Sequence, residues 1–192
     1  MSDSRLELQR ADYQSERTFA VVCTISVVAR AVIDLCQDHG FVLHPAAGNV
    51  VLLDLPFGFA LRTLQSLERT RRRIIVVTWN TSAEYLEDVW ALQPAIMLAG
   101  QTMEAELPTA LTQASQGSRY RCTGQCATAL SPPERAILQG IALGWCNQQI
   151  ADHVGIQEKS VRNILTTVYM KLGVDNRTQA ALRYWGRQDL LD

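Results

Sequence analysis

The sequence predicts an α/β domain with a doubly wound parallel sheet, followed by a smaller all-α domain. In residues 18–115, short apolar runs that suit buried strands alternate with segments of helical spacing, which is typical of a parallel sheet covered by helices. In residues 130–192, apolar residues recur with helical spacing only. Residues 116–129 are rich in Gly, Ser, Thr and Arg, so we assign them to a linker, and residues 1–17 to an N-terminal extension.

The elements of the first domain follow from apolar runs and turn signals. Continuous apolar runs such as Val50–Leu53 and Ile74–Val77 indicate strands buried on both faces, whereas the leucines between residues 61 and 67 have helical spacing. We expect strands at residues 18–26, 41–44, 49–55, 71–78 and 95–99, and helices at 27–37, 59–69, 83–92 and 103–114. Only residues 45–48 separate the second strand from the third, whereas a parallel crossover through a helix needs about a dozen residues. The second helix of the α/β pattern is therefore expected to be absent.

The second domain begins at a strong helix-start signal, Ser131-Pro132-Pro133-Glu134. Serine caps a helix, proline suits its first turn, and a glutamate three residues after the serine completes a capping box. Gly155 provides the tight turn that joins two helices of a helix-turn-helix, and Gly173 ends the helix that follows. We expect helices from residue 131 to about 145, at 147–154 and 159–172, and a fourth that opens at 176–179.

The helix predicted at residues 159–172 has two different faces. Its apolar residues fall within one stripe at helical spacing, and they are Val161, Ile164, Leu165, Val168 and Leu172. The opposite side carries Lys159, Arg162, Asn163 and Thr166, whose side chains are of the types that contact phosphates and base edges. A helix with one face for a core and another for a groove is what a DNA-recognition helix requires.

Composition limits the classes of function. The chain has a net charge of −1 and 47% hydrophobic residues, which fits packed domains and gives no overall sign of nucleic-acid binding. No apolar run reaches the roughly 18 residues of a membrane span, and the polar N-terminus lacks a signal peptide, so we expect a cytoplasmic protein without membrane contact. The five cysteines and three histidines lack metal-ligand spacing, and no nucleophile–base set is evident. We therefore expect no metal, no cofactor and no enzymatic activity.

The second domain resembles the LuxR/FixJ-type (NarL-type) DNA-binding domain. The resemblance is carried by residues 130–135, Ile150-Ala151-Asp152, residues 159–163 and Lys171–Thr178. It implies a four-helix fold that binds DNA as a dimer, with the third helix in the major groove. The implied DNA contacts are Lys159, Ser160, Arg162, Asn163 and Thr166, with Lys171 or Arg177 on the DNA backbone. Two positions depart from the family pattern: Gln157 stands where a Ser or Thr cap is usual, and Ile164 where His is usual.

The first domain resembles a flavodoxin-like receiver domain of response regulators. Asp54, in the run Val50–Pro56, matches the phosphoacceptor, and Thr78 matches the hydroxyl that senses the phosphoryl group. Receivers hold magnesium with an acidic pair after the first strand, but Thr24 and Ile25 stand there, and Ala99 matches the position of their lysine. We therefore interpret the domain as a degenerate receiver whose Asp54 is a partly solvated carboxylate that is not phosphorylated.

These observations predict a bacterial DNA-binding transcription regulator that acts independently of phosphorylation. Residues 130–192 contain seven cationic and six acidic residues, so one copy should bind DNA weakly and a homodimer on double-stranded promoter DNA is expected. RNA polymerase or a regulatory protein is a further candidate partner. Alternatives are a regulator gated by a ligand, by a partner or by oxidation of Cys122 and Cys126, and a protein that sequesters another regulator without binding DNA. The basic residues Arg69, Arg71, Arg72 and Arg73 suit either a solvated surface or an extra phosphate contact.

Overall fold

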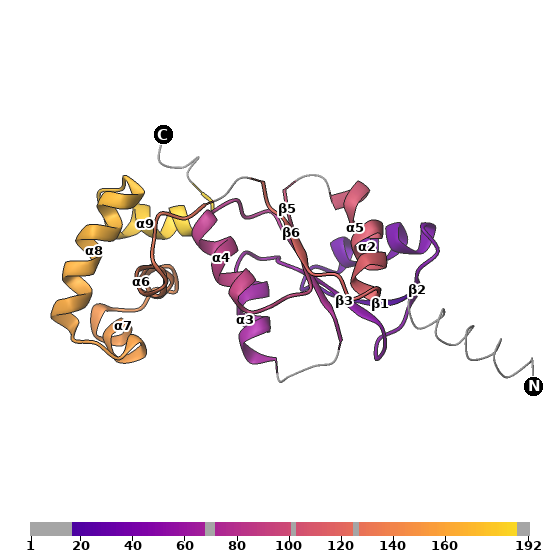
Figure 1. The fold of residues 1–192 in the computed structure, drawn as a ribbon, viewed down its shortest axis with the longest axis horizontal. Coiled ribbons are helices and arrows are strands. Elements are labelled where there is room, and N and C mark those ends of the chain that lie inside the picture. Colours follow the sequence, from indigo (N-terminus) through magenta and orange to yellow (C-terminus); the bar gives the residue numbers. More distant parts are fainter. Residues whose placement is uncertain (1–16, 68–71, 101–102, 125–126, 188–192) are drawn as a thin grey trace, which may run out of the picture. The chain divides into compact units, whose positions relative to one another are not determined.

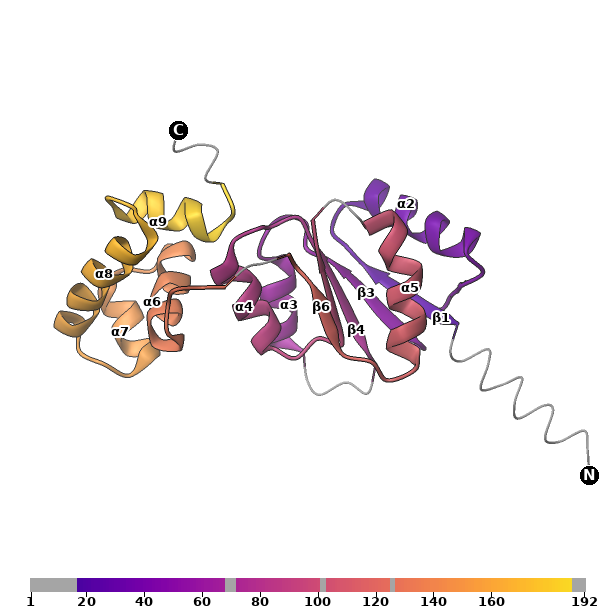
Figure 2. The same ribbon diagram turned by 45° about the horizontal axis from the view of Figure 1, so that its top comes forward.

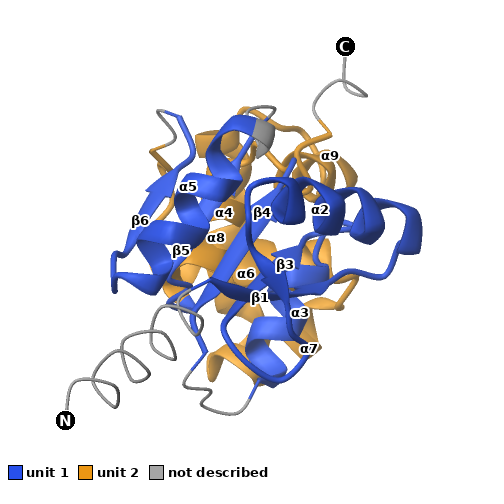
Figure 3. Ribbon diagram, turned by 90° about the vertical axis from the view of Figure 1, so that its right-hand side faces the viewer, with its two compact units in different colours: residues 1–79, 92–124 blue, residues 80–91, 125–192 orange. Residues whose placement is uncertain are grey.

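The computed structural model describes residues 17–67, 72–100, 103–124 and 127–187 (Figure 1). Nearly all of the predicted N-terminal extension therefore lies outside the described residues. The chain forms two compact units (Figure 3): unit 1 contains residues 1–79 and 92–124, and unit 2 contains residues 80–91 and 125–192. Unit 2 thus takes one helical segment from the middle of the predicted α/β domain.

Unit 1 is built on a parallel sheet with the strand order β2-β1-β3-β4-β5-β6. Its strands are β1 (Thr18–Val22), β2 (Val42–Leu43), β3 (Asn49–Leu53), β4 (Ile74–Thr78), β5 (Ile96–Ala99) and β6 (Tyr120–Cys122). Helices α2 (Ser26–Asp38) and α5 (Met103–Ser115) lie on one face of the sheet and α3 (Phe59–Ser66) on the other (Figure 2). Residues of β3 and β4 are buried almost throughout, as their continuous apolar runs require. The predicted α/β fold is confirmed.

The chain passes from β2 to β3 without a helix, as the sequence predicts. Strand β2 contains only two residues, and its last residue, Leu43, is level with Phe19 of β1, where β3 also begins. The connection therefore crosses only the width of β1 instead of returning along a full strand. Gly48 has a φ of +74°, and a Cβ atom there would lie 2.0 Å from the carbonyl oxygen of Thr18, so glycine is required at this crossing.

Arg72 holds this short connection in place. Its guanidinium donates hydrogen bonds to three backbone carbonyls of the connection, those of Pro45, Ala47 and Gly48, at 2.9–3.0 Å. Arg73 donates to the carbonyls of the turn before β6, Gly117 and Ser118, at 2.7 and 2.8 Å. These two members of the basic run therefore satisfy backbone acceptors, and Arg69 and Arg71 lie outside the described residues.

Part of the predicted linker belongs to the sheet. Tyr120 pairs with Ile96 and Cys122 pairs with Leu98, so residues 120–122 form the edge strand β6, and the prediction of a linker throughout residues 116–129 is wrong there. The strand has three residues, and only Tyr120 is partly buried. Such a short, polar edge strand produces no apolar run, because pairing to one neighbour is all that defines it.

Unit 2 is entirely helical over its described residues. It contains α4 (Ala83–Ala91), α6 (Pro132–Ala142), α7 (Asn147–Val154), α8 (Glu158–Leu172) and α9 (Arg177–Tyr184) (Figure 1). The four C-terminal helices lie within a few residues of their predicted positions. Helix α4 packs against α6 and α9, which the sequence did not indicate. In the described part of the chain, every helix is too short or too polar to cross a membrane.

A partly buried polar cluster joins α4 to α6 and α9. The carboxylate of Asp88 accepts hydrogen bonds from Arg135 at 3.0 Å, from the Tyr184 hydroxyl at 2.8 Å and from Gln139 at 3.3 Å. Burial raises the pKa of Asp88, while the hydrogen bonds from Tyr184 and Arg135 oppose that rise. The ring of Tyr85 on α4 also packs edge-on against Tyr184, with 5.6 Å between centroids. The cluster and the ring contact together fix α4 within unit 2.

Candidate nucleic-acid interface

The start of α6 and the end of α8 are tied together by charge. The backbone N–H of Ser131 donates to Oε2 of Glu134 at 2.7 Å, as the predicted capping box requires. The ammonium group of Lys171 lies 2.8 Å from both carboxylate oxygens of Glu134. Hydrogen bonds from Lys171 and from the Ser131 N–H lower the pKa of Glu134 to about 2. The carboxylate is therefore ionised at neutral pH and bridges the two helices.

Helices α7 and α8 form the predicted helix-turn-helix. Gly155 ends α7 with a φ of +76°, a left-handed conformation that favours glycine and reverses the chain toward α8. Ile150 of α7 is buried, and α8 buries one stripe of its surface, consisting of Val161, Leu165, Val168 and Leu172. Ile164, at the edge of that stripe, is only partly buried. The buried stripe fixes which face of α8 remains exposed.

The exposed face of α8 carries the side chains that the sequence predicts. Lys159, Arg162, Asn163 and Thr166 are exposed, and Ser160 is half-buried. The Thr166 hydroxyl donates to the backbone carbonyl of Arg162 at 3.3 Å, within the helix. The structure therefore brings these five candidate contacts onto one helix and leaves four of them open to solvent.

Arg162 has a partner that the sequence reasoning missed. Its Nη2 lies 2.6 Å from Oε1 of Glu158, one helical turn earlier. The i, i+4 spacing of an acidic and a basic residue was a visible signal for this ion pair. A carboxylate therefore stands among the candidate DNA contacts.

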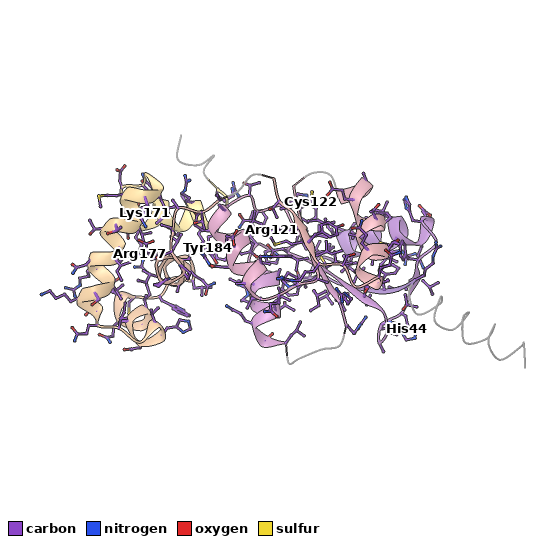
Figure 4. The ribbon with its side chains drawn as sticks, in the orientation of Figure 1. His44, Arg121, Cys122, Lys171, Arg177 and Tyr184 are labelled. Atoms are coloured by element: carbon purple, nitrogen blue, oxygen red, sulfur yellow. The ribbon has the colours of Figure 1, made fainter. Side chains whose placement is uncertain are left out.

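Lys171 and Arg177 have partners within the domain. Lys171 pairs with Glu134 and keeps an exposed side chain. Arg177 is half-buried and donates to Oδ1 of Asn147 at 3.2 Å and to the carbonyl of Trp145. Both residues lie on the helical unit and are labelled in Figure 4. Arg177 holds the start of α9 against the segment before α7, so its contact with the DNA backbone stays a prediction.

The N-terminus of α8 lacks a side-chain cap. Gln157 occupies the N-cap position with an extended backbone, and its side chain accepts no hydrogen bond from the first turn. By contrast, the side chain of Asn176 caps α9 by accepting from the Gln179 N–H at 3.0 Å. The departure of Gln157 from the family pattern therefore has a local structural consequence.

Asp54 and Thr78 meet at the end of the sheet, as their alignment with receiver residues implies. The Thr78 hydroxyl donates to Oδ2 of Asp54 at 2.8 Å, and the Ala60 N–H donates to Oδ1 at 2.9 Å. Both side chains are fully buried, so the prediction that Asp54 is partly solvated is wrong. The carboxylate lies inside because α3 begins over it and supplies the Ala60 donor. Within the described ranges, no three His, Cys, Asp or Glu side chains are placed to hold a metal ion.

The candidate redox pair is only partly described, since Cys126 lies outside the described residues. Cys122 is a free, exposed thiol 3.5 Å from a carboxylate oxygen of Glu106 (Figure 4). Local burial and Glu106 raise the pKa of this thiol. A raised pKa lowers the thiolate fraction that reacts with oxidants, so this arrangement does not favour gating by oxidation.

Comparison with known proteins supports the predicted family of the second domain. Residues 128–184 match the family model described as bacterial regulatory proteins of the luxR family. The chain is 48% identical over 74 residues to the probable HTH-type transcriptional regulator GfsR of Streptomyces halstedii, which is 38% of this chain and 30% of that protein. It is 31% identical over 123 residues to the probable transcriptional regulatory protein SgaR of Hyphomicrobium methylovorum, 59% of this chain and 57% of that protein. The matches span only part of these relatives.

Solved structures share the two-part architecture. RcsB from Salmonella enterica serovar Typhimurium, bound to a promoter in the presence of a phosphomimetic, has a TM-score of 0.59 at 17% identity, covering 89% of this chain and 98% of that one. A complex of the two-component response regulator RcsB with DNA has a TM-score of 0.56 at 19% identity and the same coverage. At these identities the likeness concerns the fold. Residues 128–184 thus match the luxR family of bacterial regulatory proteins, and the chain as a whole has a fold similar to that of these RcsB structures.

Proposed function

We propose that this protein is a bacterial transcription regulator that binds double-stranded promoter DNA through α8. The observation that carries the proposal is the division of α8 into a buried stripe and an exposed face with Lys159, Arg162, Asn163 and Thr166. Arg reads guanine, and Asn reads adenine, through paired hydrogen bonds in the major groove. Lys and Thr contact phosphates or base edges. A protein with this role acts in the bacterial cytoplasm.

We propose further that the protein binds as a homodimer. Arg135 and Lys171 are paired with Asp88 and Glu134, and Arg177 serves acceptors within its own domain, so little cationic charge is left for phosphate. Two linked copies double the contacts and raise the effective concentration of the second domain at its half-site. One related structure is described as two RcsB dimers bound to two parallel DNAs. RNA polymerase or a regulatory protein is the further partner that this role implies.

We infer that control does not use phosphorylation of Asp54. The carboxylate is buried, and its two oxygens already accept hydrogen bonds from Ala60 and Thr78. Thr24 stands where receivers have a magnesium-binding acidic residue, and its hydroxyl donates to the Leu55 carbonyl at 2.6 Å. An incoming phosphoryl group would have to displace these contacts, and among the described residues no group of His, Cys, Asp or Glu side chains is placed to hold a metal ion beside it.

Binding of the full chain to DNA tests the proposal. A random duplex library supplies a preferred site, and fluorescence anisotropy then gives the dissociation constant at two salt concentrations. Affinity should fall as salt rises, and Arg162→Ala should weaken binding to the preferred duplex by about tenfold or more. The matched control is Arg30→Ala, which removes an exposed arginine from an i, i+4 ion pair with Asp34 in unit 1. Absence of binding by the unaltered chain would favour a protein that sequesters another regulator.

A further inference from the structure

The ion pair between Glu158 and Arg162 lies at the end of α8 that a recognition helix presents to base edges. The Nη2 of Arg162 is 2.6 Å from Oε1 of Glu158, while 64% of the arginine side chain and 36% of the glutamate side chain stay exposed. Glu158 is the first helical residue after the uncapped Gln157. The pair is therefore open to solvent and adjoins Lys159.

The charge of Glu158 works against unspecific DNA binding. Phosphates attract cations regardless of sequence, and this attraction supplies most of the affinity for unspecific DNA. Glu158 places a carboxylate against Arg162, one of the two cations that the exposed face of α8 carries in its described part, and Glu158 precedes the other, Lys159, in the sequence. An exposed ion pair of this kind adds little to folding stability. The main effect of this ion pair should therefore be on the binding of DNA by the exposed face of α8.

The geometry also orients the arginine. The contact uses one hydrogen of Nη2, so Glu158 restrains the guanidinium while the second Nη2 hydrogen and those of Nη1 and Nε remain for another acceptor. Reading guanine requires the planar guanidinium to present two donors to O6 and N7 in a fixed direction. A side chain that is held in place before binding loses less conformational freedom when it forms those hydrogen bonds.

We propose that Glu158 is a positioning residue that sets the sequence preference of α8. Its carboxylate holds the Arg162 guanidinium for a base edge, and it repels phosphates when no base partner compensates. Glu158 thus lowers affinity for unspecific DNA and increases the ratio between preferred and unspecific binding. The inference rests on the proposed function, and it adds a residue that the family resemblance did not supply.

Glu158→Gln tests this role, because glutamine keeps the size and removes the charge. The full chain and the variants Glu158→Gln, Arg162→Ala and their combination are measured by anisotropy on the selected duplex and on a scrambled duplex. We expect Glu158→Gln to bind the scrambled duplex more tightly, and to lose about tenfold in the ratio of the two affinities. The combined variant should lose no more of this ratio than Arg162→Ala alone, because Glu158 acts through Arg162 and both changes remove the same interaction.

Three outcomes would overturn the proposal. If Glu158→Gln increased the affinity for both duplexes equally, Glu158 would act only by repelling phosphates and would not set sequence preference. If Glu158→Gln altered the sequence preference at a base position where Arg162→Ala does not, Glu158 would itself contact a base, for example cytosine. Absence of any DNA binding by the unaltered chain would remove the proposed function together with this inference. Asp34→Asn, which breaks the similar exposed pair with Arg30 on α2, is the matched control and should leave the ratio unchanged.

Discussion

The hydroxyl of Thr78 donates a hydrogen bond of 2.8 Å to Oδ2 of Asp54, and both side chains are fully buried. These are the two residues that the receiver resemblance places together, so the fold preserves their juxtaposition. The environment differs from what phosphoryl transfer requires, because the second oxygen accepts from the Ala60 N–H. Asp54 here ties the end of β3 to the end of β4 through Thr78 and to the start of α3 through Ala60, which is a structural role.

Small phosphodonors such as acetyl phosphate, with magnesium, should therefore leave the protein unmodified. The phosphodonor must approach the Asp54 carboxylate in line, but this side chain is fully buried. In addition, Thr24 and Ile25 occupy the positions of the acidic pair that binds magnesium in receivers. Intact-protein mass spectrometry measures the added phosphoryl group, and an ordinary receiver serves as positive control. Stoichiometric modification that disappears in Asp54→Asn would contradict this expectation.

Tyr184→Phe should destabilise unit 2 by about 1–3 kcal/mol, because it removes a hydrogen bond to the partly buried carboxylate of Asp88. Burial already raises the pKa of Asp88, so losing a donor leaves an ionised group less well compensated. Urea denaturation followed by tryptophan fluorescence gives the change in the free energy of unfolding. Tyr169→Phe is the matched control, since no hydrogen bond of its hydroxyl is found among the described residues, and an equal loss in both variants would refute the role of the Asp88 contact.

Acid should weaken the fold through Glu134. Its pKa is lowered from 4.5 to about 2 by Lys171 and the Ser131 N–H, so the ionised form is favoured in the folded state. The resulting stabilisation is complete above about pH 4.5 and is lost as the pH falls from there toward 2. Because Lys171 is partly exposed, Lys171→Met should cost about 1 kcal/mol or less at neutral pH. It should also flatten the loss of stability between pH 5 and 3, as measured by denaturation at each pH, whereas Lys159→Met should keep the original slope.

Gln157→Ser should stabilise α8. The residue has the extended backbone of an N-cap but its side chain forms no cap hydrogen bond, and a serine oxygen there can accept one from the first turn. We expect a gain of about 1 kcal/mol and a rise in Tm of about 3 °C. Differential scanning calorimetry measures the change. Gln157→Ala lacks the hydroxyl and serves as control; a similar gain from alanine would show that capping is not the cause.

The helical domain could be predicted almost residue by residue because its signals are local. The capping box at Ser131, the left-handed glycines at 155 and 173 and the apolar stripe of α8 each act within a few residues of sequence. The same holds for the exposed face that contains Arg162. The spacing of residues along one helix determines which side chains share a face, and the apolar face packs against the core.

Contacts between distant segments could not be predicted in the same way. The spacing of residues in α4 places Tyr85 on its buried face, but it does not show that the partner of Tyr85 is Tyr184. Strand β6 lacks an apolar run, and Arg72 donates to backbone carbonyls, which cannot be recognised from the types of side chain in the sequence. Such pairings are defined by the assembled fold and not by the spacing of residues in one segment.

Genome-wide mapping of DNA bound by the protein in a bacterial cell, with and without Arg162→Ala, is the sharpest test of whether α8 reads DNA. We expect the unaltered chain to occupy discrete promoter sites that share a two-fold symmetric motif. At equal protein abundance, Arg162→Ala should lose these sites or bind a degenerate form of the motif. Sites that are unchanged in position and motif in the variant, or no enrichment at promoters by the unaltered chain, would contradict the assignment of α8 as the element that reads DNA.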